Sequence, residues 1–219
     1  MVAPIEVICV DMAGTTMRDD GVVVGAFRRT IATLGLDRAS AARAESYVTA
    51  TMGQSKIEVF RAIFGPAAQR ANAVFEGAVA DVAAELGVSA LPGVEDTVTH
   101  WRTTGRRVAL TTGFSPATRE ALVAQLGWAD LFDLRVSPAD AGRGRPNPDM
   151  VWWAATRLEA SSCASIMVVG DTAADIESGR RAGAGQCVAV RTGSDDEATL
   201  LAAGADRVVD ALSALRDLG

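Results

Sequence analysis

Cysteine, histidine and tyrosine are scarce in this sequence of 219 residues, which has three cysteines, one histidine and one tyrosine. The cysteines, Cys9, Cys163 and Cys187, are odd in number and lack the spacing of a metal site, which argues against a disulfide framework and a cysteine-based zinc site. Cys9 and Cys187 lie in apolar, strand-like runs, where we expect buried free thiols. Free thiols fit a reducing compartment, so we expect a cytoplasmic protein.

Long apolar runs and an excess of positive charge are also missing. No run approaches the roughly 18 residues that a membrane-spanning helix needs. The first residues show no charged segment ahead of a long apolar stretch. We therefore expect neither membrane insertion nor a signal peptide. The net charge of −6 argues against nucleic-acid binding, which usually involves a basic stripe.

Lysine is the scarcest of the charged residues. Among the 21 lysines and arginines, Lys56 is the single lysine. This bias indicates that arginine supplies a positive charge wherever a generic one is sufficient. Lys56 is therefore a candidate for chemistry that needs an amine.

Apolar runs of strand length alternate with segments of helical period over most of the chain. Strands are predicted at residues 5–10, 106–113, 134–136, 165–171 and 186–191. Helical patterns fill the intervals between the later strands. The sequence therefore predicts an α/β fold with a Rossmann-like, doubly wound parallel sheet, whose ligand site lies at the carboxyl ends of the strands.

The segment from about 22 to 88 differs, because its apolar residues recur at three-to-four spacing throughout and no strand-like run interrupts them. We predict an all-helical cap inserted after the first strand. The expected division is a Rossmann-like catalytic core of residues 1–16 and 89–219, with a helical cap of residues 17–88.

Four polar clusters each follow a predicted strand or the loop after it. They are Asp11-Met-Ala-Gly-Thr15, Thr112-Gly113, Arg145-Pro146 and Gly170-Asp171-Thr-Ala-Ala-Asp175. Because the carboxyl ends of parallel strands meet at one edge of a sheet, we expect the clusters to converge. The alternative is a plain Rossmann-like domain in which these residues only cap loops and form turns.

The residue types in these clusters suit phosphoryl chemistry. A carboxylate such as Asp11 on a tight glycine turn can attack phosphorus. Asp171 and Asp175 lie four residues apart at a helix start and share a face, so with Asp11 they would offer oxygen ligands to Mg²⁺. Thr112 offers a hydroxyl donor, and Arg145 offers a positive fork for phosphoryl oxygens.

In order and context, the four clusters resemble the sequence motifs of the haloacid dehalogenase superfamily, over essentially the whole chain. The resemblance implies that Asp11 is a covalent nucleophile. It also implies that Mg²⁺ is held by Asp11, Asp171 and the Ala13 carbonyl, with Asp175 orienting or supplementing the metal shell. We predict substrate contacts from Ala13, Gly14, Thr15, Met52, Gly53 and Gly113.

Ala13 departs from most phosphatases of this superfamily, which have a second aspartate two residues after the nucleophile. That aspartate protonates the leaving alcohol, a role worth about 10²–10⁴ in rate. A C–P hydrolase does not need it when its carbanionic leaving group is stabilised in another way. The segment 11–16, together with Met52-Gly53 and Lys56, resembles the phosphonoacetaldehyde hydrolase (phosphonatase) branch. In that branch the cap lysine forms a Schiff base with the substrate aldehyde, which implies the same role for Lys56.

Three positions depart from that branch. Val59 stands where it has a histidine, Phe114 where it has a tyrosine, and Val22 is nearest to the position of its cysteine. The single histidine, His100, lies on a predicted helix far in sequence from every motif, and we interpret it as a surface or satisfied helix residue. Two alternatives for Lys56 stay open: a non-covalent substrate contact, or a solvated surface charge.

The sequence as a whole predicts a Mg²⁺-dependent hydrolase that cleaves the C–P bond of a small phosphonate through Asp11 and Lys56. One alternative is a small-molecule phosphatase of the same superfamily. Another is a non-catalytic phosphate- or phosphonate-binding protein. The resemblance also implies a homodimer, because phosphonatases commonly pair through their caps.

Overall fold

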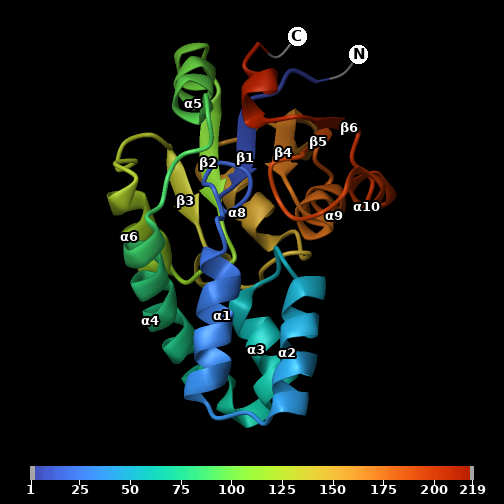
Figure 1. Cartoon of the computed structure of the whole chain (residues 1–219). Coiled ribbons are helices and arrows are strands. Elements are labelled where there is room, and N and C mark those ends of the chain that lie inside the picture. The colour runs from blue at the N-terminus through green and yellow to red at the C-terminus, as the bar shows by residue number, and fades with distance from the viewer. Residues whose placement is uncertain (1–2, 218–219) are drawn as a thin grey trace.

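The computed structural model describes residues 3–217 and contains one six-stranded sheet (Figure 1). All neighbouring strands pair in parallel, in the order β3-β2-β1-β4-β5-β6. The strands are β1 (Val7–Asp11), β2 (Arg107–Thr111), β3 (Leu134–Val136), β4 (Ile166–Gly170), β5 (Gln186–Val190) and β6 (Arg207–Val209). The winding reverses between β1 and β4, which is where sheets of this type bind ligands. The predicted doubly wound α/β fold is confirmed.

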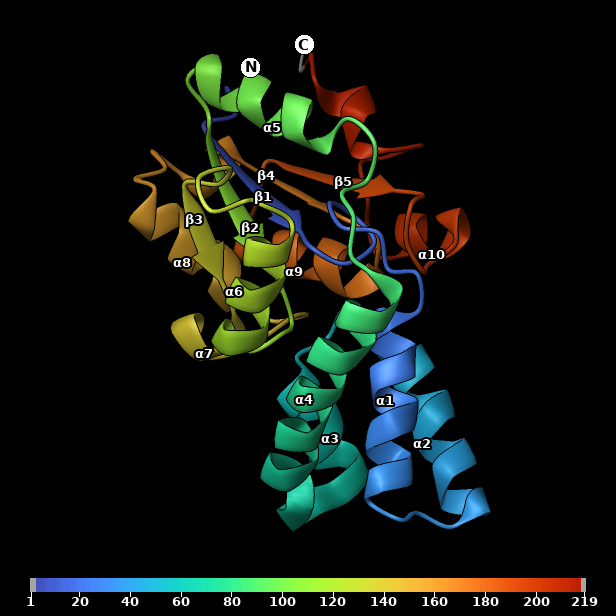
Figure 2. The same ribbon diagram turned by 60° about the vertical axis from the view of Figure 1, so that its left-hand side comes forward.

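Helices cover both faces of the sheet (Figure 2). Ile8 and Val10 of β1 pack in one apolar cluster with α5 (Val94–Thr103) and α6 (Pro116–Gln125). Val7 and Cys9 alternate with them and pack in a second cluster. The helices on that second side are α8 (Asp149–Arg157), α9 (Ala173–Ala182) and α10 (Glu197–Ala202). This alternation follows from the two-residue period of a strand. Burial on both faces explains why β1 is apolar from Val7 to Val10.

The sequence pattern did not predict β6 or the shortest helical elements. The short helix α7 (Pro138–Ala141) precedes α8, and three 3₁₀ turns occur at Gly65–Ala67, Cys163–Ser165 and Leu212–Leu215. Cys9 and Cys187 are buried free thiols, as predicted. Within the described residues, no helix combines the length and the apolar character that crossing a bilayer requires.

Four helices form a separate layer that extends from one end of the sheet (Figures 1 and 2). They are α1 (Val22–Thr33), α2 (Arg38–Ala50), α3 (Lys56–Phe64) and α4 (Ala68–Leu86). All four lie inside the range predicted for the cap. The exact division at residues 17 and 88 stays a prediction.

Two connections join these helices to the sheet, and they run side by side. The Arg18 amide donates to the Ser89 carbonyl at 3.0 Å, and the Leu91 amide donates to the Thr16 carbonyl at 2.9 Å. Met17 forms an isolated bridge with Ala90 between them. The chain therefore enters and leaves the cap through a paired linker directly after the Asp11 loop.

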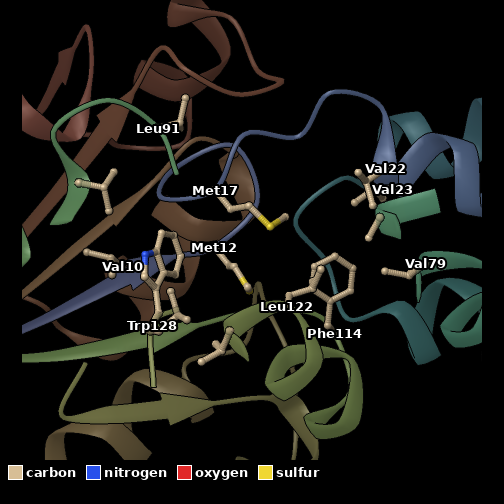
Figure 3. Packing of buried hydrophobic residues seen from close by; sticks show 14 of the residues in the cluster. Val10, Met12, Met17, Val22, Val23, Val79, Leu91, Phe114, Leu122 and Trp128 are labelled. Atoms are coloured by element: carbon tan, nitrogen blue, oxygen red, sulfur yellow. The ribbon is translucent and has the colours of Figure 1, made fainter. Parts of the chain in front are cut away.

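One apolar cluster continues from the sheet into the cap. Figure 3 shows Phe114 between Leu122 of α6 and Val79 of α4, with Met12 and Met17 close by. Because these residues are buried together, the cap packs against the core rather than standing free of it.

Within the cap, three phenylalanines from three helices pack together. The Phe75 ring centroid lies 4.6 Å from that of Phe27 and 5.4 Å from that of Phe60. Phe60 and Phe75 are fully buried, whereas Phe64 packs on Phe60 at 5.9 Å and is partly exposed. These rings provide the centre of the cap's own core.

We expect Phe75→Ala to lower the free energy of unfolding by about 3–5 kcal/mol, because it removes a buried ring and leaves a cavity. Urea unfolding followed by circular dichroism measures the loss. Phe64→Ala is the matched control and should cost less than half as much, since its ring is only partly buried. Equal losses for the two variants would contradict this description of the cap core.

Candidate active site

Asp11 is the last residue of β1, and a tight loop turns the chain away directly after it. The Thr16 hydroxyl donates to the Asp11 carbonyl at 2.9 Å, and the Gly14 amide donates to the Met17 carbonyl at 2.8 Å. Gly14 has a φ of 92°, and a Cβ there would lie 2.5 Å from Asp171 Oδ2. Glycine is therefore required both by the turn and by the close approach of Asp171.

Three buried carboxylates converge beside this loop. Asp11, Asp171 and Asp175 each offer an oxygen, and these oxygens lie within 4.8 Å of one another. Burial raises the pKa of Asp11 to about 6; Arg145 opposes the shift and Asp175 adds to it. Burial also raises the pKa of Asp171 well above its usual value, and the charges of Asp11 and Asp175 act in the same direction. The sequence prediction that these three side chains meet is confirmed.

This donor set fits a divalent cation. Hard carboxylate oxygens are the ligands that Mg²⁺ prefers, and burial together with the neighbouring carboxylates raises the pKa values of Asp11 and Asp171. The Asp171 carboxylate lies directly against the backbone of Gly193, where a Cβ would lie 1.8 Å from Asp171 Oδ2. The Thr15 hydroxyl donates to Asp171 Oδ1 at 2.9 Å, and the Ser194 amide donates to Oδ2 at 3.1 Å. Thr15 thus orients a carboxylate rather than lining the pocket itself.

Arg145 provides part of the compensating positive charge. Its Nη1 donates to Asp11 Oδ1 at 2.6 Å and forms a second ion pair with Asp175 Oδ1. Burial alone would lower the pKa of Arg145, but Asp175 and Asp11 together raise it above its ordinary value. Its Nε and Nη2 are buried and have no partner among residues 3–217. Two donors are therefore left for an anionic group bound next to Asp11.

Asp175 is fixed from two sides. Its Oδ2 accepts hydrogen bonds from the Thr172 amide at 3.1 Å and the Thr172 hydroxyl at 2.6 Å. This is the capping box that begins α9. With Oδ1 on Arg145, Asp175 positions the guanidinium in addition to contributing to the carboxylate cluster.

A pocket of about 290 Å³ opens in front of Asp11, between the core loops and the cap. The predicted site residues that line it are Asp11, Ala13, Gly14, Met52, Gly53, Lys56, Thr112, Gly113 and Asp171. Three others, Thr15, Arg145 and Asp175, are buried around it. The structure thus brings the core motifs and the cap segment to one place.

Lys56 is the first residue of α3, and only 7% of it is exposed. Burial lowers the pKa of its amine to about 8; Arg145 acts in the same direction, and Asp11, Asp19 and Asp171 oppose the shift. A solvated surface charge is therefore the wrong interpretation of Lys56. An amine with this pKa is partly neutral near physiological pH and so can act as a nucleophile.

The segment before Lys56 docks on the core through close backbone approaches. The Lys56 amide donates to the Gly113 carbonyl at 3.3 Å. A Cβ at Gly113 would lie 2.6 Å from the Gln54 carbonyl oxygen, and one at Gly53 would lie 2.2 Å from Thr172 Oγ1. The glycines at 53 and 113 therefore allow the cap to close on the pocket.

Several lining residues were not predicted. They are Asp19, Gly21, Val23, Val24, Thr49, Phe114, Thr172, Thr192, Gly193 and Ser194. The Thr192 hydroxyl donates to the Gly14 carbonyl at 2.6 Å. Residues 192–194 follow β5, so extending the rule of strand ends to that strand would have found them. Asp19 and Val24 lie at the entrance to the cap, where no motif indicated them.

The three residues that depart from the phosphonatase pattern lie in different places. Phe114 lines the pocket, whereas Val59 and Val22 are buried in the apolar cluster and do not line it. His100 lies on α5, at the other end of the sheet from the cap, and its Nε2 is 3.4 Å from Asp217 Oδ1 (Figure 1). The interpretation of His100 as a helix residue away from the site is consistent with this position.

We expect Gly53→Ala to disturb cap closure, because its methyl group would collide with Thr172 and its φ of 79° disfavours alanine. Hydrogen exchange at the Lys56 amide, which is bonded to Gly113, measures closure and should become at least about 10-fold faster, on the order of 1.4 kcal/mol. Gly35→Ala is the matched control: its φ of 68° imposes the same backbone strain, but nothing lies within 4 Å of its Cβ position. Equal effects of both variants at Lys56 would refute the docking role of Gly53.

Known proteins with similar sequences include both phosphatases and C–P hydrolases. A phosphoglycolate phosphatase of Cupriavidus necator is 29% identical, covering 97% of this chain and 92% of its own. A phosphonoacetaldehyde hydrolase of Syntrophobacter fumaroxidans is also 29% identical, covering 88% of this chain and 74% of its own. Among solved structures, a phosphonoacetaldehyde hydrolase like protein from Oleispira antarctica superposes with a TM-score of 0.83 at 24% identity, covering 98% of this chain and 91% of its own.

The sequence profile of the haloacid dehalogenase-like hydrolases matches residues 5–183, which contain all four core motifs and the whole cap. The structural likeness supports the same fold. The chain therefore belongs to the haloacid dehalogenase-like hydrolase family.

Proposed function

We propose that this hydrolase cleaves the C–P bond of a small phosphonate that carries an aldehyde, such as phosphonoacetaldehyde. The observation that carries the proposal is that the chain's single lysine is buried in the pocket that also holds Asp11. An aldehyde can form an imine with this amine while its phosphonate group faces Asp11. Neither the amine nor its depressed pKa is needed to hydrolyse an ordinary phosphate ester.

The carboxylates supply the site for the metal. Hydrolases of this family generally use Mg²⁺, and Asp11, Asp171 and the Ala13 carbonyl would hold it, with Asp175 orienting or supplementing the shell. When bound, the ion supplies positive charge that neutralises the phosphoryl oxygens. Arg145 adds its two free donors, and the Thr112 hydroxyl, which lines the pocket, contributes another.

The reaction has two covalent stages on this chain's own residues. Lys56 first condenses with the aldehyde to form an imine and release water. A carboxylate oxygen of Asp11 then attacks phosphorus, and the electrons of the C–P bond move into the imine to give an enamine. Protonation of the enamine carbon and hydrolysis of the imine release the aldehyde product, and water cleaves the aspartyl-phosphate.

Ala13 is consistent with this route. The imine accepts the electrons of the breaking bond, so no acid is required at the leaving atom. An alcohol leaving group would need a proton, and no carboxylate is present at position 13 to supply one.

A second candidate is hydrolysis of a small phosphate ester, supported by the full-length similarity to a phosphoglycolate phosphatase. In that reaction Lys56 would be a non-covalent contact for an anionic substrate, and water would replace the missing acid. The two candidates share Asp11 and the metal site. They differ in whether Lys56 forms a covalent bond.

We expect Asp11→Asn to lower phosphate release from phosphonoacetaldehyde in the presence of Mg²⁺ by at least about 10³-fold, because the amide is not a nucleophile. A phosphate assay under single-turnover conditions measures the loss, with thermal unfolding as the control for folding. Near-normal turnover by this variant would exclude the aspartyl-phosphate mechanism. Binding of phosphonoacetaldehyde by the wild-type protein without any phosphate release would instead identify a binding protein.

We expect borohydride to trap wild-type protein with phosphonoacetaldehyde as an adduct on Lys56, detected by peptide mass analysis. Trapping should increase as the pH rises through about 8, because the neutral fraction of the amine reaches about half at that pH and grows above it. Lys56→Arg keeps the charge but cannot form an imine. It should lose trapping and at least about 10²-fold of C–P cleavage, yet still hydrolyse acetyl phosphate, which needs only the Asp11 chemistry. Unchanged C–P cleavage by Lys56→Arg would contradict the imine and favour the phosphatase.

A further inference from the structure

Asp19 lies in the linker between the Asp11 loop and α1, and it lines the same pocket as Lys56. It is half-buried, and its negative charge acts on the Lys56 amine. No sequence motif indicated it. Its position at the entrance to the cap places a carboxylate on the wall of the pocket that Lys56 also lines.

The contacts of Asp19 leave part of its carboxylate available. Its Oδ1 accepts a hydrogen bond from the Val23 amide at 3.2 Å. The neighbouring Arg18 lies instead 4.0 Å from Asp20. Across residues 3–217, no arginine or lysine nitrogen lies within 4.0 Å of the Asp19 carboxylate. Its second oxygen is therefore neither capped by the helix nor neutralised by an ion pair.

The other acidic groups of the pocket already have tasks. Asp11 and Asp171 are the only other carboxylates that line it in the described part of the chain, and they serve as nucleophile and metal ligand. The remaining polar side chains on the wall are hydroxyls, which do not exchange protons readily near neutral pH. Imine formation nevertheless requires repeated proton transfers between nitrogen and oxygen.

We propose that Asp19 is a further catalytic residue, which transfers protons between Lys56 and the substrate carbonyl oxygen. The inference rests on the proposed function and adds to it the group that makes imine formation fast.

The proton transfers balance without any further reactant. Because no lysine nitrogen lies within 4.0 Å of it, the Asp19 carboxylate takes a proton from the Lys56 ammonium through one intervening water. The free amine then forms the N–C bond while Asp19 returns the proton to the carbonyl oxygen. Asp19 next takes a proton from the carbinolamine nitrogen and gives it to the hydroxyl group. The C–O bond breaks, water leaves, and the nitrogen lone pair forms the C=N bond of the iminium. Asp19 ends as it began.

A purely electrostatic role of Asp19 predicts the opposite effect on the rate. The Asp19 charge raises the pKa of Lys56, so removing it would increase the fraction of neutral amine at pH 7. Asp19→Asn would then accelerate imine formation. A purely structural role, as the acceptor for the Val23 amide, would be kept by asparagine.

The test compares the rate of borohydride trapping with phosphonoacetaldehyde in wild type, Asp19→Asn and Asp20→Asn. Asp20 is the matched control, because it is adjacent and exposed and does not line the pocket. We expect Asp19→Asn to trap about 10²-fold more slowly, with a loss of acetyl phosphate hydrolysis at least about 10-fold smaller than the loss of trapping, and Asp20→Asn to be normal in both assays. Formate should restore trapping in Asp19→Ala, since it can replace the missing carboxylate.

The outcomes separate the two proposals. Trapping by Asp19→Asn at or above the wild-type rate overturns the role of Asp19 and leaves the C–P hydrolase intact. Equal losses of trapping and acetyl phosphate hydrolysis also overturn it, because they indicate a disturbed pocket. No trapping and no phosphate release by the wild type overturns the proposed function itself.

Discussion

The pairing of Arg145 with Asp11 and Asp175 is the interaction on which the site depends. It places one buried guanidinium against two of three buried carboxylates, which would otherwise repel one another in a medium of low polarity. The balance is incomplete, because three carboxylates meet one guanidinium, and burial together with their mutual repulsion raises the pKa values of Asp11 and Asp171. The excess of negative charge is what a divalent cation would neutralise. The Nε and Nη2 atoms of Arg145, in contrast, have no partner among the described residues and need an anionic acceptor. A phosphoryl group bound with Mg²⁺ satisfies both.

The closed position of the cap adds an amine to this core chemistry. Lys56 belongs to α3, but its backbone is tied to Gly113 of the core, so its side chain reaches the pocket only while the loop before it is docked. Docking depends on missing side chains at glycines 53 and 113. The apolar contact at Phe114 holds the same interface from another side (Figure 3). In this docked position Lys56 is buried, and burial lowers the pKa of its amine.

The alternation of buried runs was enough to predict the sheet, and the rule that ligands bind at strand ends was enough to bring Asp11, Thr112, Arg145 and Asp171 together. The burial of Lys56 could not be derived in this way, because it depends on how far a helical cap leans over the core, which local periodicity does not encode. Asp19 was not predicted for a related reason: its importance comes from lining the same pocket as Lys56 and not from a sequence pattern around it. Ser194 and Gly193 follow β5, and they were missed because the strand-end rule was applied only to the four polar clusters and not to that strand.

Ala13 and Lys56 both bear on how the leaving group is stabilised in the proposed reaction. Breaking a bond to phosphorus leaves an electron pair on the departing atom, and that pair needs either a proton or a conjugated acceptor. An oxygen leaving group takes a proton, for which an aspartate at position 13 would be suited. A carbon leaving group is too basic to be helped enough by a carboxylic acid, but an imine can delocalise its electrons. A buried amine with a pKa near 8 makes that imine accessible. A carboxylate such as Asp19, on the cap side of the pocket rather than beside phosphorus, then has a task where imine protons are exchanged. The distribution of acid groups, absent at position 13 and present at the entrance to the cap, thus agrees with where the proposed C–P cleavage would need protons.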